Sequence, residues 1–138
     1  MPIPFSGGCA CGAIRYECSA EPVMSFNCHC RDCQRASGSA YYAAVVVPTA
    51  ALTFTTGSPK YNSVKADSGN TKHYGFCPDC GSPVVGTIDE HRDIRVIAAG
   101  SFDDPSWFKP TMDFYTASAH PWDYMNPALQ KFETEPTE

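Results

Sequence analysis

The stretch Cys77-Pro78-Asp79-Cys80-Gly81 has the form of half a zinc site. Two thiolates this close together on a turn can both reach one ion at about 2.3 Å, and Zn²⁺ accepts four such ligands in a tetrahedron. Pro78 restricts the backbone at the start of the turn, and Gly81 permits a positive φ directly after the second cysteine. This pair of cysteines therefore requires a second pair of ligands from elsewhere in the chain.

The remaining cysteines form one further pair, one group of three and one single residue. The chain of 138 residues has eight cysteines, which besides the first pair are Cys9 and Cys11, then Cys28, Cys30 and Cys33, and Cys18 alone. Combining the two pairs gives a four-cysteine site and leaves the group of three intact. In an alternative partition, Cys28 and Cys30 complete the site at Cys77, which leaves Cys33 and the Cys9 pair without partners.

The two predicted sites differ in kind. A closed set of four cysteines is structural, and zinc binding of this type contributes on the order of 10–16 kcal/mol to folding. Three protein ligands leave a fourth position for water or a substrate atom, which is typical of a catalytic zinc. Such a zinc is soft enough to capture an incoming thiol and hold it as a thiolate. Alternatively, Cys18 or a histidine from elsewhere closes the second site and makes it structural as well.

Two residues near these sites are expected not to be ligands. The side chain of His29 should project away from the point where Cys28 and Cys30 converge, so we expect it beside the ligands or exposed. Cys18 ends the alternating stretch Ile14-Arg15-Tyr16-Glu17-Cys18. It is most simply explained as a small buried apolar residue.

Composition excludes several classes of function. The chain is 43% hydrophobic and 18% charged, with a formal net charge of −5 and an isoelectric point near 5.2. Nucleic-acid binding is disfavoured because it depends on Lys and Arg neutralising phosphates. No apolar run approaches the roughly 20 residues of a membrane span, and the start MPIPFSGGCACG has no export pattern. We therefore expect a cytoplasmic protein, whose reducing surroundings favour thiolate ligands over disulfides.

Hydrophobic patterning predicts a mainly β protein with very little helix, arranged as a sandwich or barrel. We expect strands at Ala13–Cys18, Val23–Asn27, Tyr41–Val47, Leu52–Thr55, Tyr61–Val64, Thr71–Phe76, Pro83–Thr87, Ile94–Ala99 and Phe114–Thr116. Short helical turns are predicted at Arg31–Ser37, ending at Gly38, and at Pro127–Lys131. We expect one domain over residues 5–133, with residues 134–138 as a frayed tail.

Four segments carry a resemblance to a known family. They are G-G-C-A-C-G at 7–12, C-H-C-R-D-C-Q-R-A-S-G-S at 28–39, F-C-P-D-C-G-S-P at 76–83 and H-P-W at 120–122. In this order they resemble the glutathione-dependent formaldehyde-activating enzymes and centromere-protein-V-like proteins, over roughly residues 5 to 133. The resemblance implies an Mss4-like fold of antiparallel sheets around a structural zinc. It assigns that zinc to Cys9, Cys11, Cys77 and Cys80, and a second zinc to Cys28, Cys30 and Cys33.

The resemblance also implies an activity, a cofactor and partners. The activity is the condensation of glutathione, or a similar thiol, with formaldehyde or another small electrophile to an S-hydroxymethyl adduct, a carbon–sulfur lyase reaction read in reverse. Two zinc ions are expected per chain, the second of them partly lost where its exposed thiolates oxidise. No nucleic acid or membrane partner is implied, and no particular oligomeric state. The rival interpretation is a non-catalytic binding module in which both zinc ions are structural.

Candidate substrate contacts surround the group of three cysteines. Arg31 and Arg35 share a face if the local turn is helical, so either can bind a carboxylate of glutathione. The alternative for each is a solvated side chain or a salt bridge to a nearby carboxylate. Ser37, with the next two residues, can donate backbone amides to an anion or simply end the helix. We also consider His120 a candidate proton donor to the new alkoxide.

Lys60, Lys72 and His73 are second-rank cationic candidates. Family members often carry a basic residue shortly before the F-C-x-x-C motif. In this chain Tyr74 and Gly75 directly precede Phe76, and the basic residues stand further back. The sequence departs from the family pattern at this point.

Overall fold

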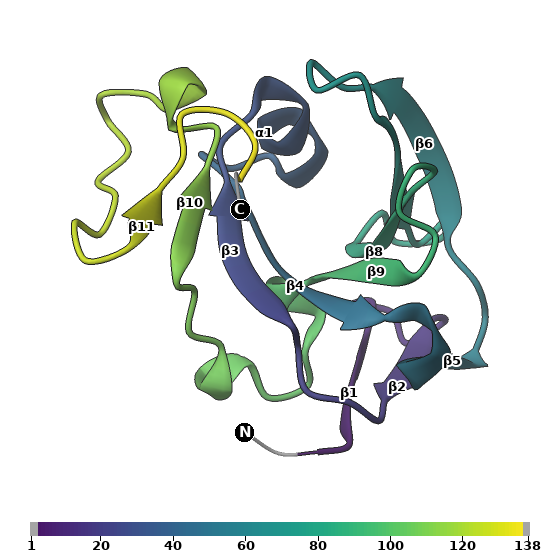
Figure 1. The fold of residues 1–138 in the computed structure, drawn as a ribbon. Coiled ribbons are helices and arrows are strands. Elements are labelled where there is room, and N and C mark those ends of the chain that lie inside the picture. Colours follow the sequence, from purple (N-terminus) through teal and green to yellow (C-terminus); the bar gives the residue numbers. More distant parts are fainter. Residues whose placement is uncertain (1–2, 137–138) are drawn as a thin grey trace.

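The structure is a computed structural model that describes residues 3–136. It has two β-sheets and one α-helix, α1 (Arg31–Ser37), as Figure 1 shows. The small sheet has the order β1-β2-β5, formed by β1 (Phe5–Gly8), β2 (Arg15–Cys18) and β5 (Leu52–Thr56). Short 3₁₀ turns lie at Thr49–Ala51, Ala99–Ser101, Pro105–Trp107 and Thr116–Ser118. The prediction of a mainly β fold with very little helix is confirmed.

The large sheet has eight strands in the order β11-β10-β3-β4-β9-β8-β7-β6. Its members are β3 (Met24–Cys28), β4 (Tyr42–Pro48), β6 (Lys60–Lys65), β7 (Thr71–Phe76), β8 (Pro83–Ile88), β9 (Ile94–Ala98), β10 (Met112–Phe114) and β11 (Gln130–Lys131). All pairings are antiparallel except those of β10, which runs parallel to both β3 and β11. In Figure 1 this sheet curves from β3 through β4 and β9 to β6, and α1 lies beside the end of β3.

Strand β4 separates two apolar cores because successive side chains of a strand point to opposite faces. Val45 and Val47 are fully buried in the core between the two sheets, together with Tyr16 of β2. Ala44 and Val46 belong to the second core, which lies on the other face of the large sheet. This second core also contains Cys28, Cys30 and Cys33, so the fold places the group of three cysteines against an apolar surface.

A β-bulge interrupts the pairing of β7 with β8 between Tyr74 and Phe76. At its centre is the buried Gly75, where a Cβ atom would overlap the carbonyl oxygen of Val85. Only glycine allows the two backbones to approach this closely. The bulge therefore sets the position of Tyr74 relative to the Cys77 turn that follows.

Most predicted elements are found with small shifts, and the helix and β7 have the predicted bounds. The helix predicted at Pro127–Lys131 is wrong, because Gln130 pairs with Met112 and the segment ends in β11. The strand predicted at Phe114–Thr116 instead ends at Phe114, since Tyr115 takes a left-handed conformation with φ 58°. The sequence analysis missed β1, whose Ser-Gly-Gly stretch lacks the β-branched and aromatic residues typical of strands.

The chain beyond residue 133 lies against the loop after β10. The carbonyl oxygen of Thr134 accepts a hydrogen bond from the backbone N–H of Tyr115 at 3.0 Å. Residues 137–138 of the expected tail lie outside the described residues, and the domain bounds stay a prediction. Within residues 3–136, no helix has the length and apolar character needed to cross a membrane.

Candidate functional site

The sulfur atoms of Cys9, Cys11, Cys77 and Cys80 all lie within 4.8 Å of one another. The Cys9–Cys11 and Cys11–Cys77 sulfur separations are 3.6 and 3.7 Å, and all four cysteines are free of disulfides. Four thiolates at about 2.3 Å from a tetrahedral zinc ion are about 3.8 Å apart. The spacing of these sulfurs therefore fits zinc, and the structure brings together the two pairs that the sequence analysis combined.

The turns that carry these cysteines direct hydrogen-bond donors at the sulfurs. Sγ of Cys9 accepts from the backbone N–H of Ile14 at 3.2 Å, and Sγ of Cys80 lies 3.2 Å from the hydroxyl of Ser82. Gly81 has φ 79°, as predicted for the residue after the second ligand, and its N–H donates to the carbonyl of Cys77. Donors of this kind stabilise the charged thiolate form, which is the form that binds metal.

The pKa values agree with this arrangement. The Ser82 hydroxyl and backbone N–H, with the backbone of Cys11, lower the pKa of Cys80 to about 5. Burial alone raises the pKa of Cys9, but the hydrogen bond from Ile14 and those from neighbouring thiols outweigh it and lower that pKa. Cys80 is thus a thiolate at neutral pH, and the pKa of Cys9 is shifted in the same direction.

The second cluster consists of Cys28, Cys30 and Cys33, whose sulfurs also lie within 4.8 Å of one another. Cys28 ends β3, and Cys30 precedes α1, where its sulfur accepts a hydrogen bond from the N–H of Cys33 at 3.3 Å. The strand end and the first helical turn therefore bring the three sulfurs together. The expectation that these thiolates are exposed is wrong, because all three residues are buried, with at most 6% of their surface exposed.

No histidine, acidic residue or further cysteine among residues 3–136 completes this second cluster. Cys18 is fully buried in the core between the two sheets, as predicted, and belongs to neither cysteine cluster. The alternative in which Cys28 and Cys30 complete the site at Cys77 is also excluded by the grouping of the sulfurs. The described residues thus offer one group of four cysteines and one group of three that could each hold a metal ion.

His29 lies beside this cluster, as predicted, and its ring is 1% exposed. Its Nε2 is hydrogen-bonded to Asp113 Oδ1 at 2.8 Å, and Nδ1 lies 2.8 Å from Asp123 Oδ2 in a close charge contact. The second oxygen of Asp113 accepts a hydrogen bond from Lys131 at 2.7 Å. These contacts hold the backbone between Cys28 and Cys30 in place, so His29 is a residue that positions the two cysteines beside it.

Two residues of β7 face the second cluster. The hydroxyl of Tyr74 lies 3.2 Å from Sγ of Cys33. The ammonium group of Lys72 lies 5.9 Å from the ring centroid of Tyr115. Burial lowers the pKa of Lys72, but the negative charge of the cysteines, led by Cys33, outweighs burial and raises it. Lys72 is therefore a cation that interacts with the charge of these cysteines, and it lines the same cavity as Cys28 and Cys33.

Charge within the second cluster is concentrated on one sulfur. Hydrogen bonds from the thiols of Cys28 and Cys33 lower the pKa of Cys30 to about 2, although burial opposes this effect. The same interactions, with burial, hold the pKa of Cys28 well above its ordinary value. A cluster with one thiolate and two thiols releases protons when a metal binds it.

A cavity of about 370 Å³ opens beside this cluster. Cys28, Cys33, Tyr42, Lys72 and Tyr74 line it where it meets the cysteines. Apolar side chains of β3, β4, β8, β9 and β10 line the remainder: Met24, Phe26, Val46, Ile88, Ile94, Val96 and Phe114. A molecule in this cavity would contact the sulfurs of the second cluster directly.

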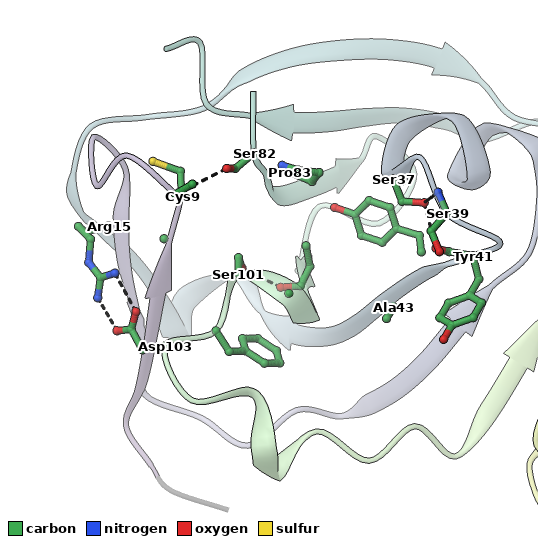
Figure 2. A pocket seen from close by; sticks show the side chains of 16 residues that line it. Cys9, Arg15, Ser37, Ser39, Tyr41, Ala43, Ser82, Pro83, Ser101 and Asp103 are labelled. Atoms are coloured by element: carbon green, nitrogen blue, oxygen red, sulfur yellow. Dashed lines mark hydrogen bonds and ion pairs between the residues drawn. The ribbon is translucent and has the colours of Figure 1, made fainter. Parts of the chain in front are cut away.

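A larger cavity, of about 590 Å³, is shown in Figure 2 and has a different lining. It is bounded at one end by Cys9 and the Arg15–Asp103 ion pair, and near the end of α1 by Ser39 and Tyr41. None of the three cysteines of the second cluster lines it. Chemistry at that cluster therefore belongs to the smaller cavity.

The other candidate substrate contacts lie on the outer side of α1. Arg31, Arg35 and His120 line a third cavity, of about 260 Å³, with Trp122 stacked on the histidine ring. Arg31 and His120 both bind the side chain of Gln34. Ser37 lies instead on the cavity of Figure 2, where its hydroxyl donates to the carbonyl of Tyr41 at 2.9 Å. The structure thus groups the two arginines with His120 but apart from Lys72 and Tyr74.

Comparisons with known proteins agree with the cysteine pattern. A family model described as "Glutathione-dependent formaldehyde-activating enzyme" matches residues 4–118. A curated Penicillium rubens protein, which carries a provisional assignment as a glutathione-dependent formaldehyde-activating enzyme, is 28% identical over 122 residues. That match covers 83% of this chain and 63% of the relative, so the chain spans less than two thirds of the relative's length.

A crystal structure of a Rhodobacter sphaeroides protein shares the fold. It superimposes with a TM-score of 0.55 at 19% sequence identity. The superposition covers 71% of this chain and 87% of that protein. At this identity the similarity concerns the fold alone.

Proposed function

This chain belongs to the family of glutathione-dependent formaldehyde-activating enzymes, and we propose that it forms or cleaves a carbon–sulfur bond between a thiol and a small aldehyde. The thiol is glutathione or a similar compound, and the aldehyde is formaldehyde or a related small electrophile. The observation that carries this proposal is a cluster of three buried cysteines, with no further cysteine, histidine or carboxylate completing it among the described residues, on a cavity that is also lined by Lys72 and Tyr74. The reaction class would be that of a carbon–sulfur lyase.

Cys28, Cys30 and Cys33 are the residues that would hold the metal. Three converging sulfurs form a soft donor set that suits zinc. When bound, zinc would supply a vacant coordination position at which an incoming thiol is held as its thiolate. Cys9, Cys11, Cys77 and Cys80 would hold the structural zinc.

The residues that line the cavity orient the thiol and the aldehyde and supply a proton. The thiol sulfur attacks the carbonyl carbon, the sulfur–carbon bond forms, and the π electrons of the carbonyl move to its oxygen. That oxygen takes a proton from the hydroxyl of Tyr74 or the ammonium of Lys72, and the proton of the thiol leaves to solvent. Burial, and then the charge of Cys33, raise the pKa of Tyr74, so its hydroxyl carries a proton at neutral pH.

For the carboxylates of glutathione we propose Arg31 and Arg35. They are four residues apart on α1 and both are exposed. Arg31 donates one hydrogen bond to Gln34, which leaves its other guanidinium donors, with those of Arg35, to bind a carboxylate. α1 begins directly after Cys30, so a peptide can extend from the sulfurs along this helix. His120 and Ser37 are secondary contacts in this proposal, through the cavities on either side of the helix.

The test is the rate at which ¹³C-labelled formaldehyde and glutathione interconvert with their adduct, measured by NMR exchange spectroscopy on the zinc-loaded chain. We expect acceleration by the wild-type chain and its loss in Cys33→Ser. Cys18→Ala is the matched control, because Cys18 is a buried cysteine that belongs to neither cluster, and it should retain the acceleration. A wild-type rate equal to the uncatalysed rate would support the non-catalytic binding module instead.

A further inference from the structure

We propose that the aldehyde used at this site carries an apolar group, aromatic or branched aliphatic, that fills the cavity beside Cys28 and Cys33. This inference rests on the proposed function and makes its substrate class specific. Formaldehyde has no such group. The cavity has the shape, lining and size to hold such a group.

The register of the sheet gives the cavity a polar end and an apolar end. Cys28 pairs with Tyr42, and four residues earlier Met24 pairs with Val46, which also pairs with Val96 of β9. Residues two and four apart on a strand share a face, at about 3.3 Å per residue. The apolar end at Met24 is therefore about 13 Å along β3 from Cys28.

Two of the other polar residues of the cavity wall, His73 and Asn70, have partners of their own. Nδ1 of His73 lies 2.6 Å from the hydroxyl of Ser63, and its Nε2 lies 2.8 Å from Asp89. The side-chain amide of Asn70 donates to Glu135 at 3.5 Å. Thr87, Tyr115 and Glu135 also contribute to the lining. Lys72, Tyr74 and the cysteine sulfurs are the polar groups at the cysteine end of the cavity, where they can meet a ligand's polar atoms.

The volume of the cavity exceeds what formaldehyde requires. About 370 Å³ corresponds to roughly twelve water volumes of about 30 Å³ each. This lies in the range of small-molecule pockets, which are about 300–1,000 Å³ and largely apolar with a few placed polar groups. Val23 at the rim is 66% exposed, so apolar surface continues to the opening. Formaldehyde would leave most of these apolar walls in contact with water.

An aldehyde such as phenylacetaldehyde fits a cavity with one polar end and one apolar end. Its carbonyl carbon would meet the thiol at the cysteine end, and its ring would lie against Val46, Ile94 and Val96. The S–H bond of the thiol breaks and its proton passes to solvent, the sulfur–carbon bond forms, and the carbonyl π electrons move to oxygen. That oxygen takes a proton from Tyr74 or Lys72, and the donor regains a proton from solvent. No oxidant or further reactant is needed.

The experiment separates binding from chemistry by using 2-phenylethanol, which has the same ring but cannot add a thiol. Methyl NMR of the zinc-loaded chain should show saturable shifts of Val46, Ile94 and Val96. Val96→Phe, which fills the cavity, should weaken binding by about tenfold or more. Val64→Phe is the matched control on β6, where Val64 lines none of the three cavities described above, and it should bind as the wild type does.

A second pair of variants avoids dependence on core packing. Val23→Asp adds a charge at the exposed rim and should also weaken binding, whereas Val64→Asp should not. With glutathione as the thiol, kcat/KM for phenylacetaldehyde should exceed that for formaldehyde by about tenfold or more in the wild type. Both Val96→Phe and Val23→Asp should reduce this ratio.

The outcomes are distinguishable. Absence of binding, or methyl shifts confined to residues of the Figure 2 cavity such as Ala43 and Ala98, would overturn this inference and leave the proposed function intact if formaldehyde still reacts. Binding of 2-phenylethanol without accelerated reaction of any aldehyde would overturn both. Binding together with an inverted preference, formaldehyde over phenylacetaldehyde, would overturn the substrate class alone.

Discussion

The hydroxyl oxygen of Tyr74 lies 3.2 Å from the sulfur of Cys33, 41 residues earlier in the chain. Cys33 is on α1, and Tyr74 directly precedes the bulge at Gly75, on the strand that leads into the Cys77 turn. If both clusters hold zinc, the structural ion fixes the turn that follows β7, and β7 presents a proton donor to the second cluster. The two metal sites are thereby connected through one strand.

Replacing Tyr74 by phenylalanine removes the hydroxyl but keeps the ring. We expect Tyr74→Phe to lower kcat/KM for adduct formation by about a hundredfold, within the range for a lost general acid. The zinc content should stay unchanged. Tyr61→Phe, at an exposed tyrosine of the neighbouring strand β6, is the control. Equal activity of Tyr74→Phe and wild type would exclude Tyr74 as the donor and leave Lys72.

The two clusters should differ in what they contribute to stability. Cys77→Ser should lose one zinc equivalent and much of the free energy of unfolding, because a structural zinc supplies on the order of 10 kcal/mol. Cys33→Ser should lose one zinc equivalent with a much smaller change. Metal analysis and urea denaturation of the two variants check this. Similar losses of stability in both would indicate two structural ions.

Arg31→Gln and Arg35→Gln test the proposed carboxylate contacts. Each should raise KM for glutathione by about fivefold, since these exposed groups are partly screened by solvent. KM for 2-mercaptoethanol, which has no carboxylate, should be unaffected in the same variants. Arg92→Gln, at an exposed arginine in the loop before β9, serves as the control. An equal rise with both thiols would point to damage of α1 rather than loss of a carboxylate contact.

The buried pair of His29 and Asp113 predicts a pH-dependent stability. Burial alone raises the pKa of Asp113, but Lys131 and His29 outweigh it and hold that pKa below its ordinary value. The carboxylate therefore stabilises the fold above the unfolded carboxyl pKa of about 3.9, and this contribution is lost as pH falls through the lower, folded-state pKa.

Asp113→Asn should accordingly reduce the free energy of unfolding by about 2 kcal/mol near neutral pH. Its difference from wild type should shrink as the pH falls below about 4. Urea denaturation across this range provides the measurement, with the exposed Asp67→Asn as control. A difference that stays constant with pH would mean that the charge of Asp113 does not stabilise the fold.

Cysteine spacing was sufficient to predict both clusters, because two thiols separated by one or two residues on a turn must converge. Alternating hydrophobicity located most strands, and Gly38 marked the end of α1. Local sequence signals did not predict the correct secondary structure where pairing with a distant strand decides the conformation. Gln130 joins a parallel strand despite the helical signal at Pro127, and β1 is held by pairing with β2.

The cavity and its proton donors were harder to predict. Lys72 was a second-rank candidate and Tyr74 was noted only as a departure from the family pattern, because nothing local shows that β7 packs beside β8 and faces α1. The partners of His29 lie 84 residues away at Asp113, and also at Asp123. Only the Gly-Phe-Cys stretch at 75–77 carried a usable signal, since an isolated glycine within a strand suggests a bulge.

The central claim is that three cysteines leave one ligand position for a thiol, and zinc K-edge X-ray absorption tests it most directly. In the zinc-loaded wild type, added glutathione should raise the mean number of sulfur ligands per zinc and displace a lighter donor. Cys33→Ser, retaining only the first site, should show no such change. A sulfur count that is unaffected by glutathione in the fully loaded wild type would contradict the account.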